Sequence, residues 1–338
     1  MDSRVTSRLD PSGLPDDEHT LPPITELSFP ALGVRSLCWD GDELVDWVGG
    51  GQRWTLDGRA LPPVREPETT FDGAVVLPGS PWAAVFEKRG EAGLILRDGR
   101  PWRSLKRAEH CAGSYHYPIV LFRLAGGRAV IAHCPESYCS LHIDDLETGE
   151  TIAACPIPDA DDYFPAGLEV SPCGRWLLSA GGWVWHPLSN VRVYDIEVAL
   201  RDPRTLGGEG IPISVWADCA DASFLPDSRL LVTLTGNWAD LDDGTHFDDE
   251  LALYDLARPD SPRRWPLDSW TCGVMAMGAA HAFTFHQHLR LVALDGLREV
   301  RAWPDFTLSA GERAFDSQRG RLAWAQDDRI VVLQLKAP

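Results

Sequence analysis

The chain has 338 residues, 44% of them hydrophobic, which is enough apolar material for a large buried core. Nucleic acids and anionic membranes are bound largely through Lys and Arg, so a formal net charge of −19 argues against both as direct partners. Thirty Gly and 26 Pro, spread along the chain without a long amphipathic helix pattern, favour many short strands and frequent turns.

The first residues are polar and interrupted by Pro, without a periodic apolar pattern, and we expect a disordered arm over 1–23. The stretch 24–29 then alternates apolar and polar residues, as a strand with one buried face does. The N-terminus lacks the apolar core of a secretory signal, and no apolar run reaches the roughly 18 residues of a membrane span. None of the eight Cys forms a Cys-x-x-Cys pair. These features favour a cytoplasmic protein with reduced thiols.

Three similar units of short apolar strands and turns follow, over 34–63, 71–105 and 118–157. In the first two, an Asp-Gly pair follows the third strand, at Asp57 and at Asp98, and a later unit repeats this at Asp295. Asp-Gly favours a type I′ hairpin turn, in which both central residues have a positive φ. The first two pairs are about 40 residues apart, which is typical of one β-propeller blade.

The clearest unit lies at 165–216. A strand ends at Ser171-Pro172-Cys173-Gly174, a second begins at Arg175-Trp176-Leu177-Leu178, and a third ends in Tyr194-Asp195. Strand, tight turn, strand, loop and strand at this spacing are typical of one four-stranded propeller blade.

Three further units lie at 222–267, 273–303 and 312–335. The last of them has only three strands, whereas the alternating stretch 24–29 belongs to no unit. Because an open ring would expose strand edges, closure of the ring is favoured. We therefore predict an all-β, seven-bladed β-propeller over 24–336, in which 24–29 supplies the outermost strand of the last blade. The alternative is an N-terminal arm that lies across one face of the ring.

Parts of the chain resemble the WD-repeat β-propeller family. The Ser-Pro-x-Gly turn and the following Arg-Trp-Leu-Leu strand match the family over 171–178, and Tyr194-Asp195 and Tyr254-Asp255 stand where the family has Trp-Asp. The resemblance is strongest over 164–256, and no Gly-His dipeptide occurs, so the family's His–Asp hydrogen-bond relay is not expected. The resemblance implies a toroid with a central channel that serves as a rigid interaction platform. It implies no catalytic chemistry.

In such a propeller, the loops between second and third strands and the connections between blades emerge on one face, here called the loop face. The longest loops on this face are 181–190 and 236–250, and loops longer than about twelve residues are often functional. Aromatic rings on loops provide contact area at low entropic cost, and nearby carboxylates suit a basic protein or peptide. The alternative is that the two loops pack on each other and bury their Trp rings.

The function favoured by this pattern is a non-enzymatic interaction scaffold. Its candidate binding residues are aromatic, acidic or imidazole side chains of the loop face: Trp183, Trp185, His186, Trp238, His246, Phe247, Tyr117, Tyr163, Asp218, Asp221 and Trp270. One alternative is a propeller hydrolase or lyase at the channel mouth, with His186, His286 and Asp221 as acid–base residues. Another is a sensor that binds a small molecule or peptide without turnover.

Two segments invite a metal interpretation. The acidic loop 240–250 does not have the ligand spacing of an EF-hand. Alternation over His286-Gln287-His288 would place both imidazoles on one side of a strand, although a solvated strand end is the more common reason for such a pattern. Phosphate-binding and nucleophile-elbow motifs do not occur. We expect neither a metal nor a cofactor.

Overall fold

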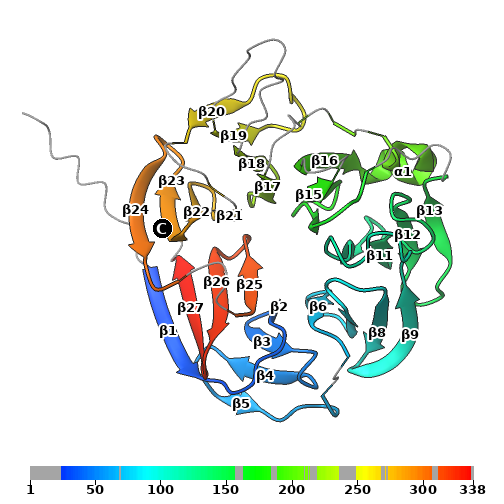
Figure 1. The fold of residues 1–338 in the computed structure, drawn as a ribbon, viewed down its shortest axis with the longest axis horizontal. Helices are drawn as coiled ribbons and strands as arrows, with labels where there is room; N and C mark the ends of the chain where they lie inside the picture. Colours follow the sequence, from blue (N-terminus) through cyan, green and yellow to red (C-terminus); the bar gives the residue numbers. More distant parts are fainter. Residues whose placement is uncertain are drawn as a thin grey trace, which may run out of the picture.

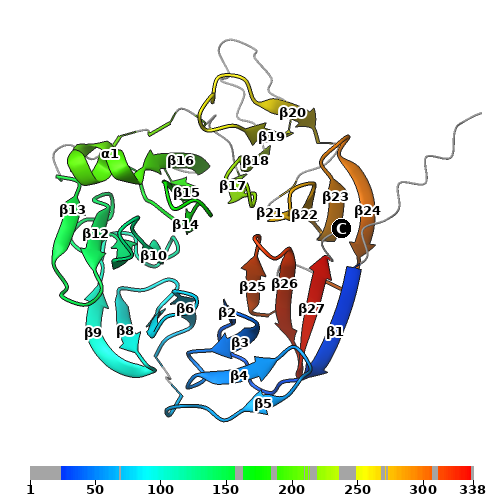
Figure 2. The same ribbon diagram turned by 180° about the vertical axis from the view of Figure 1, so that it is seen from behind.

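The fold is a ring of seven small antiparallel sheets around a central axis (Figure 1, and from behind in Figure 2). The computed structural model describes residues 24–67, 70–156, 163–183, 189–208, 210–211, 213, 219–235, 249–267, 271, 273–306 and 311–335. Within the first six sheets the strands follow chain order from the axis outward. The predicted seven-bladed β-propeller is therefore confirmed.

The first three blades each have four strands. The first blade consists of β2 (Cys38–Asp40), β3 (Glu43–Asp46), β4 (Gln52–Thr55) and β5 (Ala60–Leu61). The second consists of β6 (Gly73–Val76), β7 (Trp82–Phe86), β8 (Ala92–Arg97) and β9 (Arg100–Lys106). The third consists of β10 (Ile119–Arg123), β11 (Ala129–His133), β12 (His142–Asp145) and β13 (Thr151–Ala154).

The next three blades contain the only helices of the described ranges. The fourth blade consists of β14 (Leu168–Val170), β15 (Trp176–Trp183) and β16 (Ser189–Asp195), followed by α1 (Ile196–Arg201) and the 3-10 helix η2 (Pro203–Leu206). The fifth consists of β17 (Cys219–Phe224), β18 (Leu230–Thr235), β19 (Glu250–Tyr254) and β20 (Arg263–Pro266). The sixth consists of β21 (Val274–Met277), β22 (His281–His286), β23 (His288–Ala293) and β24 (Arg298–Trp303).

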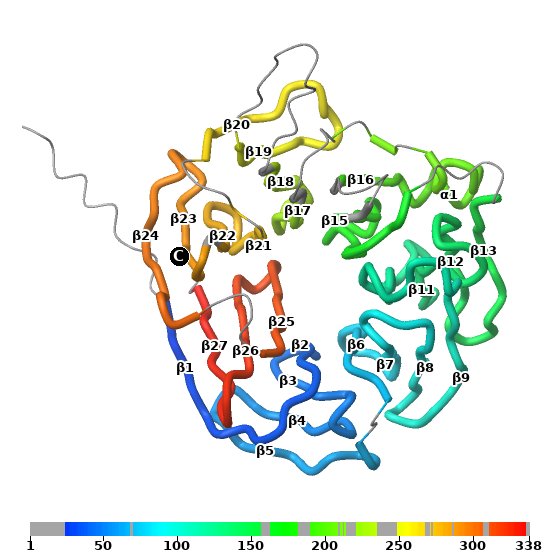
Figure 3. Tube along the Cα trace, viewed as in Figure 1, coloured from blue at the N-terminus to red at the C-terminus, as the bar shows by residue number. Residues whose placement is uncertain are grey.

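The seventh blade joins the two ends of the folded chain. It consists of β25 (Arg313–Asp316), β26 (Arg321–Gln326), β27 (Arg329–Leu335) and β1 (Ile24–Pro30). β1 pairs antiparallel with β27 in a continuous register from Ile24 opposite Leu335 to Pro30 opposite Arg329, and the two strands lie side by side in Figures 1 and 3. Ring closure by the N-terminal strand is thus confirmed, and the alternative of an arm across one face is wrong.

The fourth blade departs from the four-stranded template that the sequence predicts. After β16 the chain forms a helix, because Asp195 caps its N-terminus by accepting a hydrogen bond from the Val198 N–H. Ile196 and Ala199 lie on the same side of this helix and pack against the third blade. Among the described residues that follow, Ile211 alone returns to pair with β16, through a single bridge to Val193.

The three Asp-Gly pairs all lie between third and fourth strands, as predicted, but their backbones differ. Asp98 and Gly99 have φ values of 52° and 73°, as a type I′ turn requires. At Asp57-Gly58 only the glycine is positive, at 81°, and its N–H donates to the Thr55 carbonyl. In the third turn the positive φ falls on Leu297. One sequence signal therefore produces three different hairpin turns.

The core is divided among the seven boundaries between neighbouring blades. Seven apolar clusters fill these boundaries, one at each. Between the third and fourth blades, for example, Phe122 packs with Leu177 and Tyr194. Each blade thus buries its apolar residues against two neighbours, as in other repeat architectures. Among the described residues no helix is long and apolar enough to cross a membrane.

Candidate functional site

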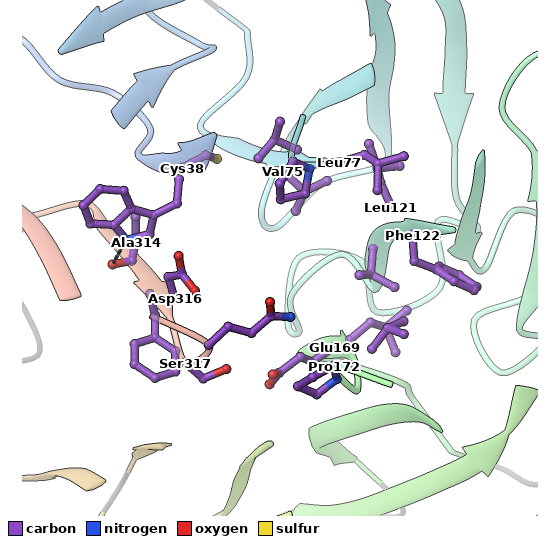
Figure 4. Close-up of a pocket in the computed structure, with 18 of the residues that line it drawn as sticks. Cys38, Val75, Leu77, Leu121, Phe122, Glu169, Pro172, Ala314, Asp316 and Ser317 are labelled. Carbon is purple, nitrogen blue, oxygen red and sulfur yellow. Dashed lines mark hydrogen bonds between the residues drawn. The ribbon is translucent and has the colours of Figure 1, made fainter. Parts of the chain in front are cut away.

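The inner strands of five blades border a cavity of about 830 Å³ in the central channel (Figure 4). These strands are β2, β6, β10, β14 and β25. Apolar side chains, including Val75, Leu77 and Leu121, form most of the labelled wall, and Glu169 provides a carboxyl group at its edge. The wall therefore combines apolar side chains with charged ones, among them Glu169 and Arg313, and such a cavity can hold and orient a small ligand.

Two carboxyl groups on neighbouring inner strands have raised pKa values. Burial, and secondarily the charge of Asp221, raises the pKa of Glu169 to about 8, although the Phe224 backbone N–H opposes the shift. Burial raises the pKa of Asp221 to about 6, against the Val274 and Ala222 N–H groups and the charge of Arg313. Asp221 Oδ2 accepts from the Val274 N–H at 3.0 Å, which links the fifth blade to the sixth. Asp221 is therefore a clamp between blades.

A second site lies on the loop face, where three separate segments bring four rings together. The rings of His110 and Tyr138 have centroids 4.8 Å apart, and those of Tyr138 and Phe164 stack at 4.2 Å. Tyr115 meets Phe164 edge-on at 5.0 Å. His110 is exposed, Tyr138 is half-buried, and the other two rings are buried. We call His110, Tyr115, Tyr138 and Phe164 the ring cluster.

The common position of these rings follows from strand direction. His110 and Tyr115 belong to the connection that enters β10, and Tyr138 belongs to the loop between β11 and β12. Phe164 belongs to the connection that enters β14. In an antiparallel sheet, the start of the first strand and the end of the second lie at the same end. The ring cluster therefore occupies the loop face between the third and fourth blades.

Arg107 supports the ring cluster from below. Its side chain is 1% exposed, and its guanidinium donates to the backbone carbonyls of Gly90 at 2.6 Å, Tyr115 at 3.1 Å and Ala112. The guanidinium also lies over the ring of Tyr115, 4.6 Å from its centroid, and over that of Tyr117, at 5.0 Å. Burial lowers the pKa of Arg107. These contacts fix the connection to the loop of the second blade.

Charged groups border the ring cluster and the nearby channel opening. Glu109 and Glu136 are both exposed. Glu109 is next to His110 in the sequence, and Glu136 is two residues before Tyr138. Across the first blade, Lys88 Nζ binds Glu312 at 2.6 Å and 2.7 Å and so connects the second blade to the seventh. The loop face thus combines the exposed His110 ring and the half-buried Tyr138 ring with exposed carboxylates of the same segments.

Most of the residues predicted to bind a partner lie outside the described ranges. These are Trp185, His186, Trp238, His246, Phe247, Asp218 and Trp270. Trp183 ends β15 and His286 ends β22, but their side chains are also outside the description. The structure therefore brings together only part of the predicted surface, and the role of these nine residues stays a prediction.

Two of the predicted binding residues lie beneath the loop face. The rings of Tyr117 and Tyr163 are only 3% and 2% exposed. The Tyr163 hydroxyl and Ser179 Oγ are 2.8 Å apart, and Arg192 lies over the Tyr163 ring at 4.0 Å. Tyr117 packs edge-on against Phe86. Both tyrosines are therefore packed inside the blades, beneath the surface loops, where they stabilise the fold.

The predicted strand through His286 and His288 is wrong. Gln287 has a φ of 50° and turns the chain, so that His286 ends β22 and His288 begins β23 opposite it. The alternation predicted from the sequence assumed an unbroken strand, whereas the left-handed residue produces a tight hairpin. In the part of the chain that the structure describes, no three His, Cys, Asp or Glu side chains are grouped to hold a metal.

Sequence reasoning missed four residues of these sites: Arg107, His110, Tyr138 and Glu169. Tyr138 lies between the second and third strands of its blade, and this position alone could have placed it on the loop face. Glu169 immediately precedes the Val170-Ser171-Pro172 strand end, but its place in the channel depends on which strand is innermost. No local signal indicates that Arg107 is buried.

No protein-family model matches the sequence, and no curated protein matches it either. Solved structures are similar in fold. The chain resembles Kuenenia stuttgartiensis hydrazine synthase, with 14% identity and a TM-score of 0.60 over 97% of this chain and 99% of the other. It resembles a chain of the mitotic checkpoint complex, with 13% identity and a TM-score of 0.60 over the full length of both. The Neurospora crassa Pan2 WD40 domain is similar at 12% identity, with a TM-score of 0.54 over 90% and 89%. These similarities establish a shared, WD40-like propeller fold.

Proposed function

We propose that this protein is a non-enzymatic interaction module that binds a basic protein or peptide on its loop face. The observation that carries the proposal is the ring cluster, in which exposed His110 and half-buried Tyr138 rest on buried Phe164. Rings held in a fixed position lose little entropy on binding, and such aromatic groups dominate the energy of many interfaces.

The proposed partner is basic for electrostatic reasons. Glu109 and Glu136 are exposed beside the rings, and the whole chain has a formal net charge of −19. An Arg or Lys of a partner can stack on an aromatic face and pair with a neighbouring carboxylate at the same time. The negative field of the protein also accelerates encounter with a positively charged partner.

The predicted binding residues extend this surface in the proposal. Trp183 ends β15, Trp185 and His186 belong to the chain between β15 and β16, and Trp238, His246 and Phe247 belong to the chain between β18 and β19. Asp218 and Trp270 belong to connections that enter the fifth and sixth blades, whereas Asp221 lies within β17 and supports the surface by linking these two blades. Tyr117 and Tyr163 support these parts without touching the partner. Two of the similar solved chains, a WD40 domain and a member of a checkpoint complex, agree with a binding role.

The proposal is tested by affinity capture with four forms of the full chain. We compare the wild type with His110→Ala/Tyr138→Ala and with Trp185→Ala/Trp238→Ala; Trp102→Ala is the control, because Trp102 is 46% exposed on the outer strand β9. Captured proteins are identified, and their basic segments are titrated as purified peptides. Each double variant should weaken peptide binding by at least about tenfold, or 1.4 kcal/mol. Unchanged binding by both double variants would remove the proposed surface.

A further inference from the structure

We propose that the channel cavity binds a small organic cation, with the Glu169 carboxylate as its counter-charge. This site is separate from the ring cluster and from the interaction role proposed above, since it lies among the inner strands. The cavity, at about 830 Å³, is within the range of pockets that enclose small ligands. Its size suits a compact ligand, and its mixed apolar and charged wall suits one that carries both an apolar surface and a charge.

Glu169 is placed to meet such a ligand. Its side chain is half-buried on β14, and Figure 4 shows the carboxyl group at the edge of the cavity among the wall residues. Charged and titratable groups face this region from the surrounding inner strands. They are Asp221 on β17, Arg313 and Asp316 on β25, Arg319 just after β25, Arg123 on β10 and Cys38 on β2.

The basic groups of the wall are engaged elsewhere. Arg313 acts on Asp221, and Arg123 Nη1 donates to the Gly127 carbonyl at 3.0 Å. Asp316 is bound by Arg321 at 2.9 Å and by Arg319 at 3.2 Å, so this second carboxylate already has its cations. Among the described residues, no cation pairs with Glu169, whose described partner is the Phe224 N–H. Of the two cavity carboxylates, Glu169 is thus the one available to pair with the cation of a ligand.

An aromatic residue of the wall favours the same ligand. Phe315, which is half-buried, borders the cavity, and an aromatic face attracts a cation. Burial and the nearby charge of Asp221 raise the pKa of Glu169 to about 8, so its ionised form is only partly compensated by protein groups. Binding of a cation therefore favours the ionised carboxylate, and the proton that Glu169 held passes to the buffer. Affinity should rise with pH up to about 8 and level off above it.

The test uses choline, whose quaternary ammonium does not titrate, and dimethylbutanol, the uncharged analogue in which carbon replaces nitrogen. Calorimetric titration of the full chain should detect choline binding and no binding of dimethylbutanol. Below pH 8 the apparent affinity for choline should increase roughly tenfold per pH unit, in proportion to the ionised fraction of Glu169. Repeating the titration in buffers of different ionisation enthalpy should reveal release of about one proton per choline below pH 7.

Glu169→Gln should abolish choline binding and proton release, whereas Glu147→Gln, an exposed carboxylate in another turn, should change neither. Proton release by the wild type tests the proposal even if Glu169→Gln does not fold. Equal binding of choline and dimethylbutanol, or choline binding that Glu169→Gln leaves intact, would overturn it. Absence of choline binding up to about 10 mM would also overturn it, since the affinity would then be below that of an ordinary ligand site.

Discussion

Arg107 is the residue on which the geometry of the ring cluster depends. Its planar guanidinium donates to three carbonyls and stacks on two tyrosine rings, and a Lys cannot reproduce either the fork or the stacking. These hydrogen bonds and ring contacts tie the connection between β9 and β10 to the loop of the second blade. The exposed His110 ring therefore owes its position to a buried side chain three residues earlier.

Arg107→Lys should lower the free energy of unfolding by about 3 kcal/mol, because buried carbonyls lose their donors. Urea unfolding followed by Trp fluorescence measures this loss. Arg89→Lys, on the exposed part of the neighbouring loop, is the matched control and should change stability by less than about 0.5 kcal/mol. Equal effects of the two substitutions would show that Arg107 does not organise the connection.

Glu169 and Asp221 make stability depend on pH. Their ordinary pKa values of 4.5 and 3.8 rise to about 8 and about 6 in the folded protein, so the folded state holds more protons than the unfolded chain between these limits. The contribution of the two groups is complete below about pH 4, falls as pH rises, and is lost above about pH 8. Glu169→Gln should flatten the decline between pH 6 and pH 8 in chemical unfolding curves. Curves for wild type and variant that remain parallel over this window would contradict the shift.

At the scale of elements, β1 determines whether the ring is closed. Phe29 is the buried residue of this strand and packs with Trp39 and Ile330 at the boundary between the seventh and first blades. The other side chains of β1 are half-buried or exposed, so the strand depends on this contact and on its seven-residue pairing with β27.

Phe29→Ala should therefore lower the free energy of unfolding by about 3–4 kcal/mol, the usual cost of removing a buried Phe. Ser28→Ala, on the exposed side of the same strand, should cost less than about 1 kcal/mol. Thermal and urea unfolding measure both. If Phe29→Ala were as mild as Ser28→Ala, β1 would be a loosely attached arm.

The sequence predicts elements well where a local signal determines them. The strands, the Ser171–Gly174 turn and the closing role of 24–29 could all be predicted, because alternation and turn residues are local properties. The helix α1 could not, since a six-residue helix is too short to show its period and the four-stranded template predicts a strand there. The Asp-Gly turns show the same limit, because the sequence determines the hairpin but not its backbone type.

At the scale of the whole molecule, the site depends on which loops meet in space. His110, Tyr138 and Phe164 come from three segments, and only the ring of blades brings them together. The sequence places Tyr117 and Tyr163 on the correct connections but does not indicate that their rings point into the core. The channel position of Glu169 likewise depends on the order of strands from the axis.

The solved structures explain why the fold can be assigned while the partner must be proposed. Identities of 12–14% over nearly the whole length mean that other residues build a similar ring in each protein. Closure and packing between neighbouring blades determine that ring, whereas binding depends on particular side chains at its surface. The proposed binding role therefore depends on the ring cluster of this chain and not on the fold that it shares with the solved structures.

We propose that a basic partner covers His110 and Tyr138 on the loop face. Hydroxyl-radical footprinting of the full chain, alone and saturated with a captured basic peptide, tests it most directly. We predict several-fold protection of Tyr138 and His110, while Trp102 on β9 keeps its reactivity. Unchanged reactivity of Tyr138 and His110 at saturation, or protection confined to the opposite face, would contradict the account.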